Sequence, residues 1–391
     1  MPTITLPTEA GTLEPYALGN SREFPKATPP FPRVALAAAH VVADPLAEQD
    51  PWLDAKIDWD RTIAYRRYLW SLGLGVAEAM DTAQRGMGLD WVAAQELIRR
   101  SLDAMKDMPG AVMASGAGTD HLAPGPDVTV DDVIRAYEEQ CEAVEKMGGR
   151  IILMASRALA KAARSPADYE RVYGRILSGV AQPVIIHWLG EMFDPALEGY
   201  WGNHDHLEAM ETALAVIHAN AAKVDGVKIS LLDDQKEIRM RRRLPPKGGN
   251  GRVRMYTGDD FNYAELIAGD EHGYSDALLG IFDPIAPAVG GALASLQRND
   301  LATFHDILAP TVPLSRHIFK APTRFYKTGV VFMAWLNGHQ DHFVMVGGQQ
   351  STRSIRHFAE LFRLADKAGL LRDPEMAASR MRGLLALHGV A

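Results

Sequence analysis

The most informative residue in this chain is a lysine inside an apolar segment. Lys228 lies in GVKISLL, a run that is typical of a buried parallel strand. A lysine is almost never buried without a specific reason, because its ammonium group loses hydration. Burial also lowers the lysine pKa and makes the neutral amine available to attack a carbonyl carbon. Schiff-base chemistry at Lys228 is therefore our first hypothesis. The alternative is a lysine that extends to the rim of the barrel or pairs with a structural carboxylate.

His187 is the second candidate for catalysis. It lies in PVIIHWLG, at the end of another apolar run. An imidazole has an ordinary pKa of about 6.5, so it can transfer protons near neutral pH. We predict that His187 shuttles a proton beside Lys228. The alternative is a core histidine that is bonded to a backbone carbonyl.

Short apolar segments alternate with amphipathic stretches over most of the chain. In the stretch 130–147, apolar residues recur at steps of three and four, as one buried helix face requires. Strand–helix units repeated in this way over about 250 residues are typical of a (β/α)8 TIM barrel. A doubly wound sheet is less favoured, because no glycine-rich phosphate turn follows the first strand. The eight expected strands begin near Val34, Gly75, Ala111, Ile151, Val184, Gly226, Val253 and Gly273.

The barrel pattern divides the chain into three parts. Residues 1–32 are rich in Pro, Thr and Gly, and we expect an irregular N-terminal arm there. Residues 33–299 form the barrel. Residues 300–391 form a C-terminal helical region, with helices expected over 301–319, 351–368 and 374–387.

Polar residues at the strand ends are candidates for binding and catalysis, because TIM barrels carry their active sites at that face. One combination of them also permits a divalent-metal site, formed by His40, Glu78 and His187. No tight spacing motif supports this metal site, and we expect a covalent imine without a cofactor or metal. The strand-end set contains His40, Glu78, Asp81, Asp120, His121, Ser156, Arg157, His187, Thr257, Asp259, Asp260, Asp276 and Asp283.

Two segments resemble the dihydrodipicolinate synthase and N-acetylneuraminate lyase superfamily. They are VDGVKISLLDDQKEI and VRMYTGDDFNYAELIAGDEHGYSDALLGIFDPIAP. The resemblance rests on a strand with Gly-hydrophobic-Lys, on the turn Gly258-Asp259-Asp260, and on a small-residue strand that leads into a helix with Pro284 and Pro287. It implies a class I lyase or aldolase in a divergent branch of the superfamily, with Lys228 as the imine-forming lysine.

The chain departs from the superfamily pattern at two places. The usual Gly-Thr-Thr-Gly-Glu motif, which binds the carboxylate of a 2-keto acid, is replaced here by MDTAQRGMGLDW. We expect Thr82 and Arg85 to hold the carboxylate instead. The usual catalytic tyrosine is replaced by His187. We further expect Asp81, Asp120 and His121 to recognise substrate hydroxyls, with Thr257 and Asp259 also in the binding site.

Composition excludes several other classes of protein. The chain has 391 residues, a net charge of −8 and one cysteine, Cys141. It therefore has no intramolecular disulfide or multi-cysteine metal site, and its acidic balance disfavours nucleic-acid binding. No apolar run reaches the roughly 18–20 residues of a membrane span, and the first residues lack a secretory pattern. We expect a cytoplasmic homo-oligomer that binds a small molecule.

Together these features predict a class I lyase or aldolase, or a related dehydratase, that acts on a 2-keto acid or an oxidised sugar acid. One alternative is a metal-dependent TIM-barrel aldolase or isomerase of sugar-like substrates. Another is a ligand-binding barrel without catalysis, which the replaced threonine pair and tyrosine would permit.

Overall fold

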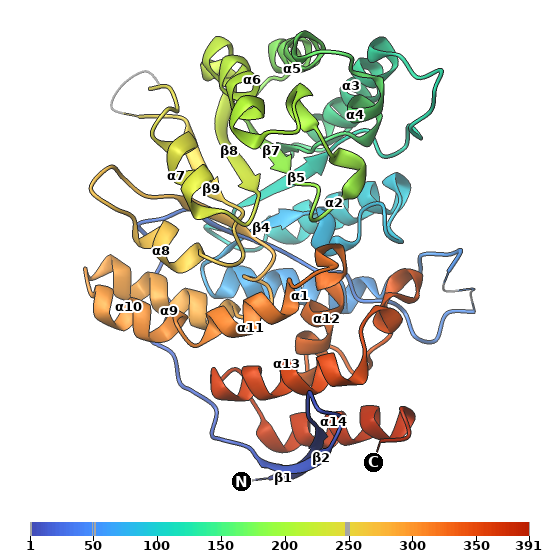
Figure 1. Cartoon of the computed structure of the whole chain (residues 1–391), viewed down its shortest axis with the longest axis vertical. Coiled ribbons are helices and arrows are strands. Elements are labelled where there is room, and N and C mark those ends of the chain that lie inside the picture. Colours follow the sequence, from blue (N-terminus) through green and yellow to red (C-terminus); the bar gives the residue numbers. More distant parts are fainter. Residues whose placement is uncertain (1, 49, 51, 247–250, 391) are drawn as a thin grey trace.

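The computed structural model describes residues 2–48, 50, 52–246 and 251–390. Eight parallel strands close into a barrel in the order β10-β3-β4-β5-β6-β7-β8-β9, with helices around it (Figure 1). The predicted (β/α)8 TIM barrel is therefore confirmed. Its strands are β3 (Ala35–Ala38), β4 (Gly75–Glu78), β5 (Met113–Ala117), β6 (Ile151–Leu153), β7 (Val184–Leu189), β8 (Val224–Ser230), β9 (Arg254–Thr257) and β10 (Asp276–Leu279).

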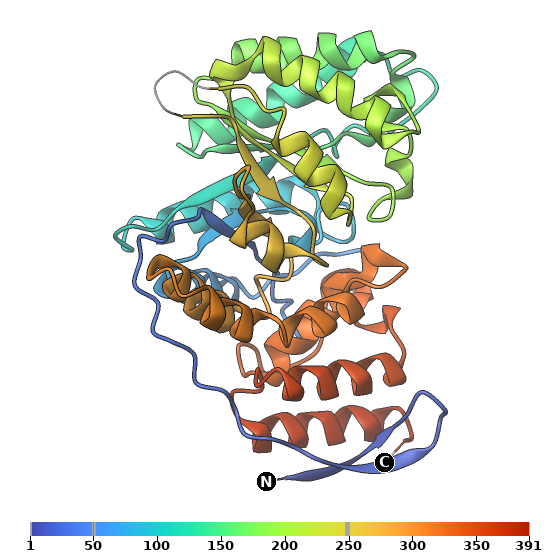
Figure 2. The same ribbon diagram turned by 60° about the vertical axis from the view of Figure 1, so that its left-hand side comes forward.

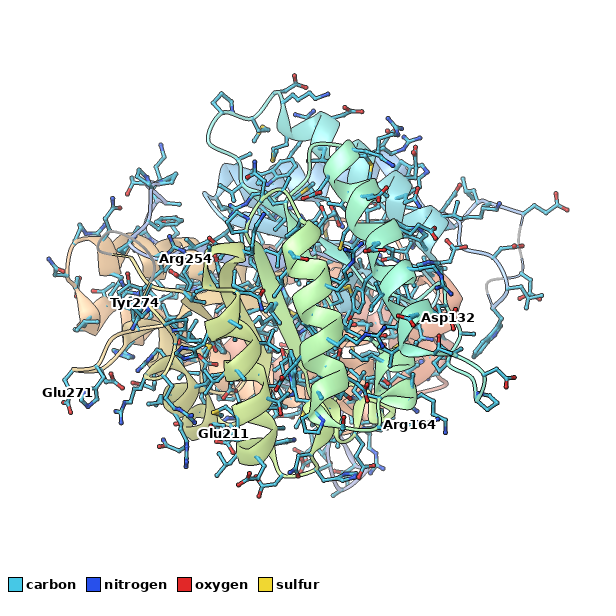
Figure 3. All side chains as sticks on the ribbon, turned by 90° about the horizontal axis from the view of Figure 1, so that it is seen from above. Asp132, Arg164, Glu211, Arg254, Glu271 and Tyr274 are labelled. Atoms are coloured by element: carbon cyan, nitrogen blue, oxygen red, sulfur yellow. The ribbon has the colours of Figure 1, made fainter. Side chains whose placement is uncertain are left out.

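Helices connect successive strands and cover the outside of the barrel. Several begin at side-chain caps, as at Thr129 and Asp132, which form a capping box at the start of α3. Charged residues such as Asp132, Arg164 and Glu211 lie at the periphery in the view from above (Figure 3). None of the described helices has the length and apolar character needed to cross a bilayer. The barrel helices are α1 (Trp59–Ser71), α2 (Trp91–Met105), α3 (Val130–Lys146), α4 (Arg157–Ala162), α5 (Pro166–Gly179), α6 (His206–Ala219), α7 (Asp234–Arg241), α8 (Tyr263–Ala268) and α9 (Ala286–Gln297).

The core has two layers, one inside the barrel and one between strands and helices. Side chains alternate between these layers along each strand. Ile185 of β7 and Tyr256 of β9 belong to the inner layer. Val227 and Ile229 of β8 belong to the outer layer. Lys228 lies between these two residues, so its side chain faces the barrel interior.

The C-terminal region contains one helix that the sequence analysis did not predict. This is α12, in which every residue except Trp335 is buried. A helix that is buried on nearly all sides has no amphipathic period, so its sequence did not indicate a helix. Figure 1 places α12 between the barrel and α13. The helices of this region are α10 (Leu301–Leu308), α11 (Thr311–Ile318), α12 (Tyr326–Leu336), α13 (Ile355–Lys367) and α14 (Pro374–Leu387).

The N-terminal arm is not irregular throughout, and that prediction is wrong for residues 3–17. This stretch forms an antiparallel hairpin of β1 (Thr3–Pro7) and β2 (Leu13–Ala17), which lies against α13 and α14. Ile4 and Leu6 are buried and Thr5 is exposed, a period-two pattern that composition alone hides. The following segment runs along the molecule to the barrel, and both chain termini lie at the hairpin end (Figure 2).

Candidate active site at the C-terminal end of the barrel

Lys228 occupies the inside of the barrel between two neighbouring strands. It pairs in register with His187 of β7 and Tyr256 of β9, and only 7% of its surface is exposed. A Cβ atom at Gly258 would lie 2.8 Å from Cε of Lys228 and 2.4 Å from the carbonyl oxygen of Ile229. The lysine side chain therefore depends on a glycine at position 258. Among the described residues, Lys228 Nζ forms no ion pair or hydrogen bond.

A second buried charge lies close to this lysine. Asp260 follows β9 and is 3% exposed, and its Oδ1 atom accepts a hydrogen bond of 2.9 Å from the amide of Ile281. Burial raises the pKa of Asp260 to about 7, although the charge of Lys228 opposes the shift. Burial lowers the pKa of Lys228, and the charges of Asp260 and Asp81 oppose that shift. Burial therefore moves the pKa values of the two groups toward one another.

Asp259, which we predicted to bind substrate, has different hydrogen-bond partners from Asp260. Its carboxylate accepts hydrogen bonds from the amide of Phe261 at 2.8 Å and from Nδ2 of Asn262 at 2.8 Å. Thr257 is fully buried, and its hydroxyl accepts a hydrogen bond from the amide of Asp259. Both residues hold the turn that leads into α8. Asp260 is the functional candidate that our binding set omitted.

His187 lies next to Lys228 and is completely buried. Its Nε2 atom is 3.3 Å from the hydroxyl of Ser230, while Nδ1 has no partner among the described residues. Burial, with the charge of Lys228, holds the pKa of His187 well below its ordinary value. The imidazole is therefore neutral near pH 7, which favours hydrogen bonding over the proton shuttling that we expected from it.

A small cavity opens beside His187 at the barrel mouth, with a volume of about 80 Å³. This volume is well below the roughly 300–1,000 Å³ of pockets for drug-sized ligands, so the cavity suits a molecule of few atoms. Lys228 lies next to His187, which lines the cavity, but Lys228 itself does not line it. The lining residues are Asp81, Arg85, Gly86, Gly118, Thr119, Asp120, Leu122, Pro124, Met154, Ala155, Arg157, His187, Leu189, Asp194 and Leu197.

Arg85 lines this cavity, but its hydrogen-bond donors are already engaged. Its Nε atom donates to Asp120 at 2.9 Å, and its other nitrogens donate to Asp120, Gln140 and the backbone of Gly116. His121 contacts the same Gln140 at 2.8 Å. Burial opposes ionisation of Asp120, yet the hydrogen bonds from Arg85 lower its pKa. This network engages Arg85, Asp120 and His121, which we expected to bind substrate, whereas Asp81 and Thr82 lie outside it.

The first turn of α12 adds two polar side chains to the barrel mouth. The hydroxyl of Tyr326 lies 2.8 Å from that of Thr82, and both residues are buried. Lys327 Nζ donates to the carbonyl of Arg324 at 3.0 Å. Burial lowers the pKa of Lys327 to about 8, against the charges of Asp81 and Asp194. A lysine within the apolar sequence YKTGVVFMAWL is the same signal that identified Lys228, and it could have revealed this residue.

His40, Glu78 and His187, the residues of the alternative metal site, each contact a different partner and not one another. His40 Nδ1 lies 2.7 Å from Asp283, whereas Glu78 bonds Arg66 at 2.8 Å and the hydroxyl of Ser101 at 2.6 Å. Glu78 faces away from the barrel interior because it alternates with the inner residue Ala77. No group of three His, Cys, Asp or Glu side chains arranged to hold a metal occurs in the described part of the chain.

Comparisons with known proteins agree with this architecture. A sequence model of the family described as "Protein of unknown function (DUF993)" matches residues 4–390. Comparison with curated proteins yields no match.

Among solved structures, this chain is similar to dihydrodipicolinate synthase of Thermotoga maritima, with 14% identity, a TM-score of 0.62, and coverage of 86% of this chain and 100% of that one. It is also similar to YagE of E. coli K12 in complex with pyruvate, a prophage protein of the same family (12% identity, TM-score 0.61, 92% and 99% coverage). A third is the chloride-inhibited Acinetobacter baumannii synthase complexed with pyruvate (14%, 0.62, 86% and 99%). The predicted structural resemblance is confirmed.

Proposed function

This chain belongs to the DUF993 family, and from its barrel fold and its buried lysine we propose that it is a class I lyase or aldolase that forms a Schiff base on Lys228. The observation that carries the proposal is the position of Lys228 inside the barrel, 7% exposed and without an ion pair among the described residues. Burial lowers the pKa of this lysine, which favours the neutral, nucleophilic form of the amine.

The substrate that fits best is a 2-keto acid or a related oxidised sugar acid. The cavity beside His187 is small, and Arg157 lies on its wall. Lys327 lies near the same mouth, within the field of Asp81 and Asp194. We assign the binding of the substrate carboxylate to Lys327 and to the terminal nitrogens of Arg157. Within the described part of the chain, Arg157 donates to Asp194 through Nε alone, whereas every nitrogen of the Arg85 guanidinium already has a partner. Two of the similar solved structures are complexes with pyruvate, which belongs to this chemical class.

The proposed reaction begins when neutral Lys228 attacks the substrate carbonyl carbon. The carbinolamine that results loses one water molecule and becomes an imine, so the carbonyl oxygen leaves as water. The protonated imine then accepts the electron pair of the bond between the α and β carbons as that bond breaks, and the β-hydroxyl fragment loses a proton and leaves as a carbonyl compound. The enamine that remains takes up a proton on its α carbon and becomes an imine again, and the reverse sequence forms the bond. Hydrolysis finally returns the free lysine. The chemistry needs no cofactor or metal.

Three neighbouring groups would serve these steps. Asp260, with a pKa of about 7, would accept the proton that Lys228 must lose before it attacks. The hydroxyl pair of Tyr326 and Thr82 would pass a proton to the departing water. His187 would donate or accept a hydrogen bond through Nδ1, the ring atom that has no partner among the described residues.

Borohydride trapping tests this proposal directly. The protein is incubated with pyruvate and longer 2-keto acids, reduced, and analysed by intact mass and peptide mapping. We expect the mass of the reduced substrate on Lys228, and no adduct in Lys228→Ala. Lys327→Met removes the other buried lysine of the described residues and should still be labelled at Lys228 when the keto acid is saturating. Lys320→Met, at an exposed lysine, is the matched control and should be labelled as the parent protein is.

Two results would refute the Schiff-base mechanism. One is an adduct on Lys327 in place of Lys228. The other is activity on a sugar-like substrate that survives in Lys228→Ala and disappears with a chelator, which is the behaviour of the metal-dependent alternative.

A further inference from the structure

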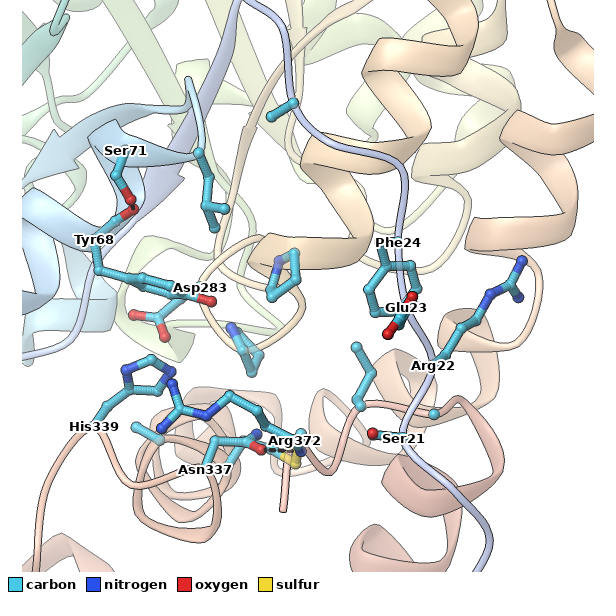
Figure 4. A pocket seen from close by; sticks show the side chains of 18 of the residues that line it. Ser21, Arg22, Glu23, Phe24, Tyr68, Ser71, Asp283, Asn337, His339 and Arg372 are labelled. Atoms are coloured by element: carbon cyan, nitrogen blue, oxygen red, sulfur yellow. Dashed lines mark hydrogen bonds between the residues drawn. The ribbon is translucent and has the colours of Figure 1, made fainter. Parts of the chain in front are cut away.

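A larger cavity lies apart from the barrel mouth, between the N-terminal segment, α1 and the C-terminal helices. Its volume is about 550 Å³, within the roughly 300–1,000 Å³ range of small-molecule sites. One wall is the segment Ser21–Ala27, and the opposite wall comes from Tyr65 and Tyr68 of α1 and from the last turn of α12. In the close view, Tyr68, His339 and Arg372 point toward one another, across from Glu23 and Phe24 (Figure 4).

Several hydrogen-bond donors on this wall have no partner among the described residues. They are the guanidinium of Arg372, which is exposed to solvent, the side-chain amide nitrogen of Asn337, which is buried, and the hydroxyl of Tyr68, which is half-buried. The backbone amide of Arg372 donates to Oδ1 of Asn337 at 2.9 Å, which orients the amide group of Asn337. A Cβ atom at Gly338 would lie 3.4 Å from Nη2 of Arg372, so the guanidinium lies over this glycine. Free donors gathered around one arginine fit an anionic acceptor.

The aromatic part of the wall is uncharged near neutral pH. The ring of His339 lies 4.9 Å from the ring of Tyr65 and 4.6 Å from that of Tyr68. Burial, together with the charge of Arg372, lowers the pKa of His339 to about 4, so the imidazole is uncharged near neutral pH. Burial raises the pKa of Tyr68 to about 12, which keeps the hydroxyl protonated as a donor. These faces offer contacts for an apolar or aromatic body.

The buried carboxylate of this cavity, Asp283, forms no ion pair with Arg372. Asp283 accepts hydrogen bonds from the backbone amide of His40 at 2.8 Å and from the hydroxyl of Tyr65 at 2.9 Å. It also contacts the ring of His40 at 2.7 Å. Its oxygens are therefore satisfied by the protein. Glu23 lies on the far wall and is exposed to solvent.

We propose that this cavity is a second ligand site that binds a small carboxylate with an aromatic or apolar body. Arg372 and Asn337 hold the carboxylate, and Tyr68 donates a further hydrogen bond. Tyr65, His339 and Phe24 contact the body. The proposal is independent of the Schiff base on Lys228, because none of these residues belongs to the barrel-mouth cavity.

Calorimetric titration with 3-phenylpropionate tests the site, and its uncharged amide of the same shape tests the role of the carboxylate. We expect saturable binding of the acid with a Kd below about 1 mM. We expect at least about tenfold weaker binding of the amide, and the same loss in Arg372→Gln, since a charge-assisted hydrogen bond is removed.

Controls locate the binding to this cavity. Arg239→Gln removes an exposed arginine on α7, and Lys228→Ala removes the proposed imine lysine; both should bind as the parent protein does. Ser71→Trp should block binding by filling the cavity edge from the exposed end of α1. The proposal is overturned by no saturation up to about 10 mM, by equal binding of acid and amide, by unchanged binding in Arg372→Gln, or by loss in Lys228→Ala alone.

Discussion

Lys228 and Asp260 place two buried ionisable groups of opposite charge at one end of the barrel. Each is disfavoured in its charged form by burial and favoured by the charge of the other. The pKa of Asp260 rises to about 7 while that of Lys228 falls, so the two pKa values move toward one another. Burial therefore lowers the free-energy cost of passing a proton from Lys228 to Asp260.

Asp260→Asn should change both the pH dependence and the rate of imine formation. The negative charge of Asp260 stabilises the ammonium form of Lys228, so its removal lowers the lysine pKa further. The ascending limb of the trapping rate against pH should move to lower pH by about one unit. The maximal rate should fall about 100-fold, because the proton acceptor is lost. Rapid-quench borohydride trapping between pH 5 and pH 9 measures both effects.

Asp225→Asn is the matched control for this pH experiment. Asp225 lies at the opposite end of β8, where its carboxylate accepts a hydrogen bond of 2.7 Å from the hydroxyl of Tyr256. An asparagine oxygen can accept the same bond. We expect the ascending limb of the pH–rate profile and the maximal trapping rate to be unchanged in this variant. A limb that moves to higher pH in Asp260→Asn would contradict the assigned charge coupling.

Helix α12 extends from the barrel mouth to the larger cavity. Its first turn carries Tyr326 and Lys327 to the barrel mouth. Its last turn, with Met333 and Ala334, lines the larger cavity. The helix can serve both places because it is buried on nearly every side between the barrel and α13. Helix α12 therefore adds a tyrosine and a lysine to the barrel mouth that do not come from the eight strand–helix units.

Lys327→Met should weaken substrate binding more than it slows the chemical step. The ammonium of Lys327 lies at the barrel mouth, and methionine keeps the length and apolar packing of the side chain. We expect KM for the keto acid to rise about tenfold with kcat changed less than about threefold, the pattern of lost ground-state binding. Steady-state kinetics measure this division. Lys320→Met, at an exposed lysine of the same region, should leave both constants unchanged.

A fall in kcat with little change in KM would show that Lys327 does not bind the substrate. If kcat falls and KM stays constant, the lysine acts in the chemical step or holds α12 in place. Measurement of the thermal midpoint separates these two cases, because only a structural role lowers it.

The two ends of the chain meet far from the barrel and form one packed unit. The hairpin β1–β2 lies on α13 and α14, and the hydroxyl of Tyr16 donates to Asp366 at 2.7 Å. The amide of Gly19 donates to the same carboxylate at 3.1 Å. The segment that follows then forms a wall of the larger cavity. The N-terminal arm therefore stabilises the C-terminal region.

Leu6→Ala tests this role of the arm. Leu6 is fully buried, and truncation of a buried leucine costs about 2–5 kcal/mol through lost burial and an unfilled cavity. We expect a loss in this range in urea-induced unfolding of the C-terminal region. Thr5→Ala, at the exposed neighbouring position, should change the free energy of unfolding by less than about 0.5 kcal/mol. Equal effects of the two substitutions would show that the hairpin does not contribute through its buried face.

Much of the fold could be predicted because its signals are local. Apolar runs separated by amphipathic stretches marked all eight strands, and the period of two within GVKISLL directs Lys228 to the inside of the barrel once Val227 and Ile229 face the helices. The hairpin carried the same period in Thr3–Pro7. Helix α12 was missed because uniform burial removes the amphipathic period that identifies a helix.

The amino-acid sequence by itself determined the barrel, its strand positions and the buried lysine, since covalent geometry sets the side-chain periods that these features follow. Only the tertiary structure decided which groups surround that lysine. Thr82 and Tyr326 are 244 residues apart, and Arg85 and Asp120 are 35 apart, yet each pair is in direct contact. Asp260, and not Asp259, is the charged neighbour of Lys228, because side chains beyond the end of a strand no longer alternate with a period of two. Their direction depends on packing between segments that are remote in the sequence.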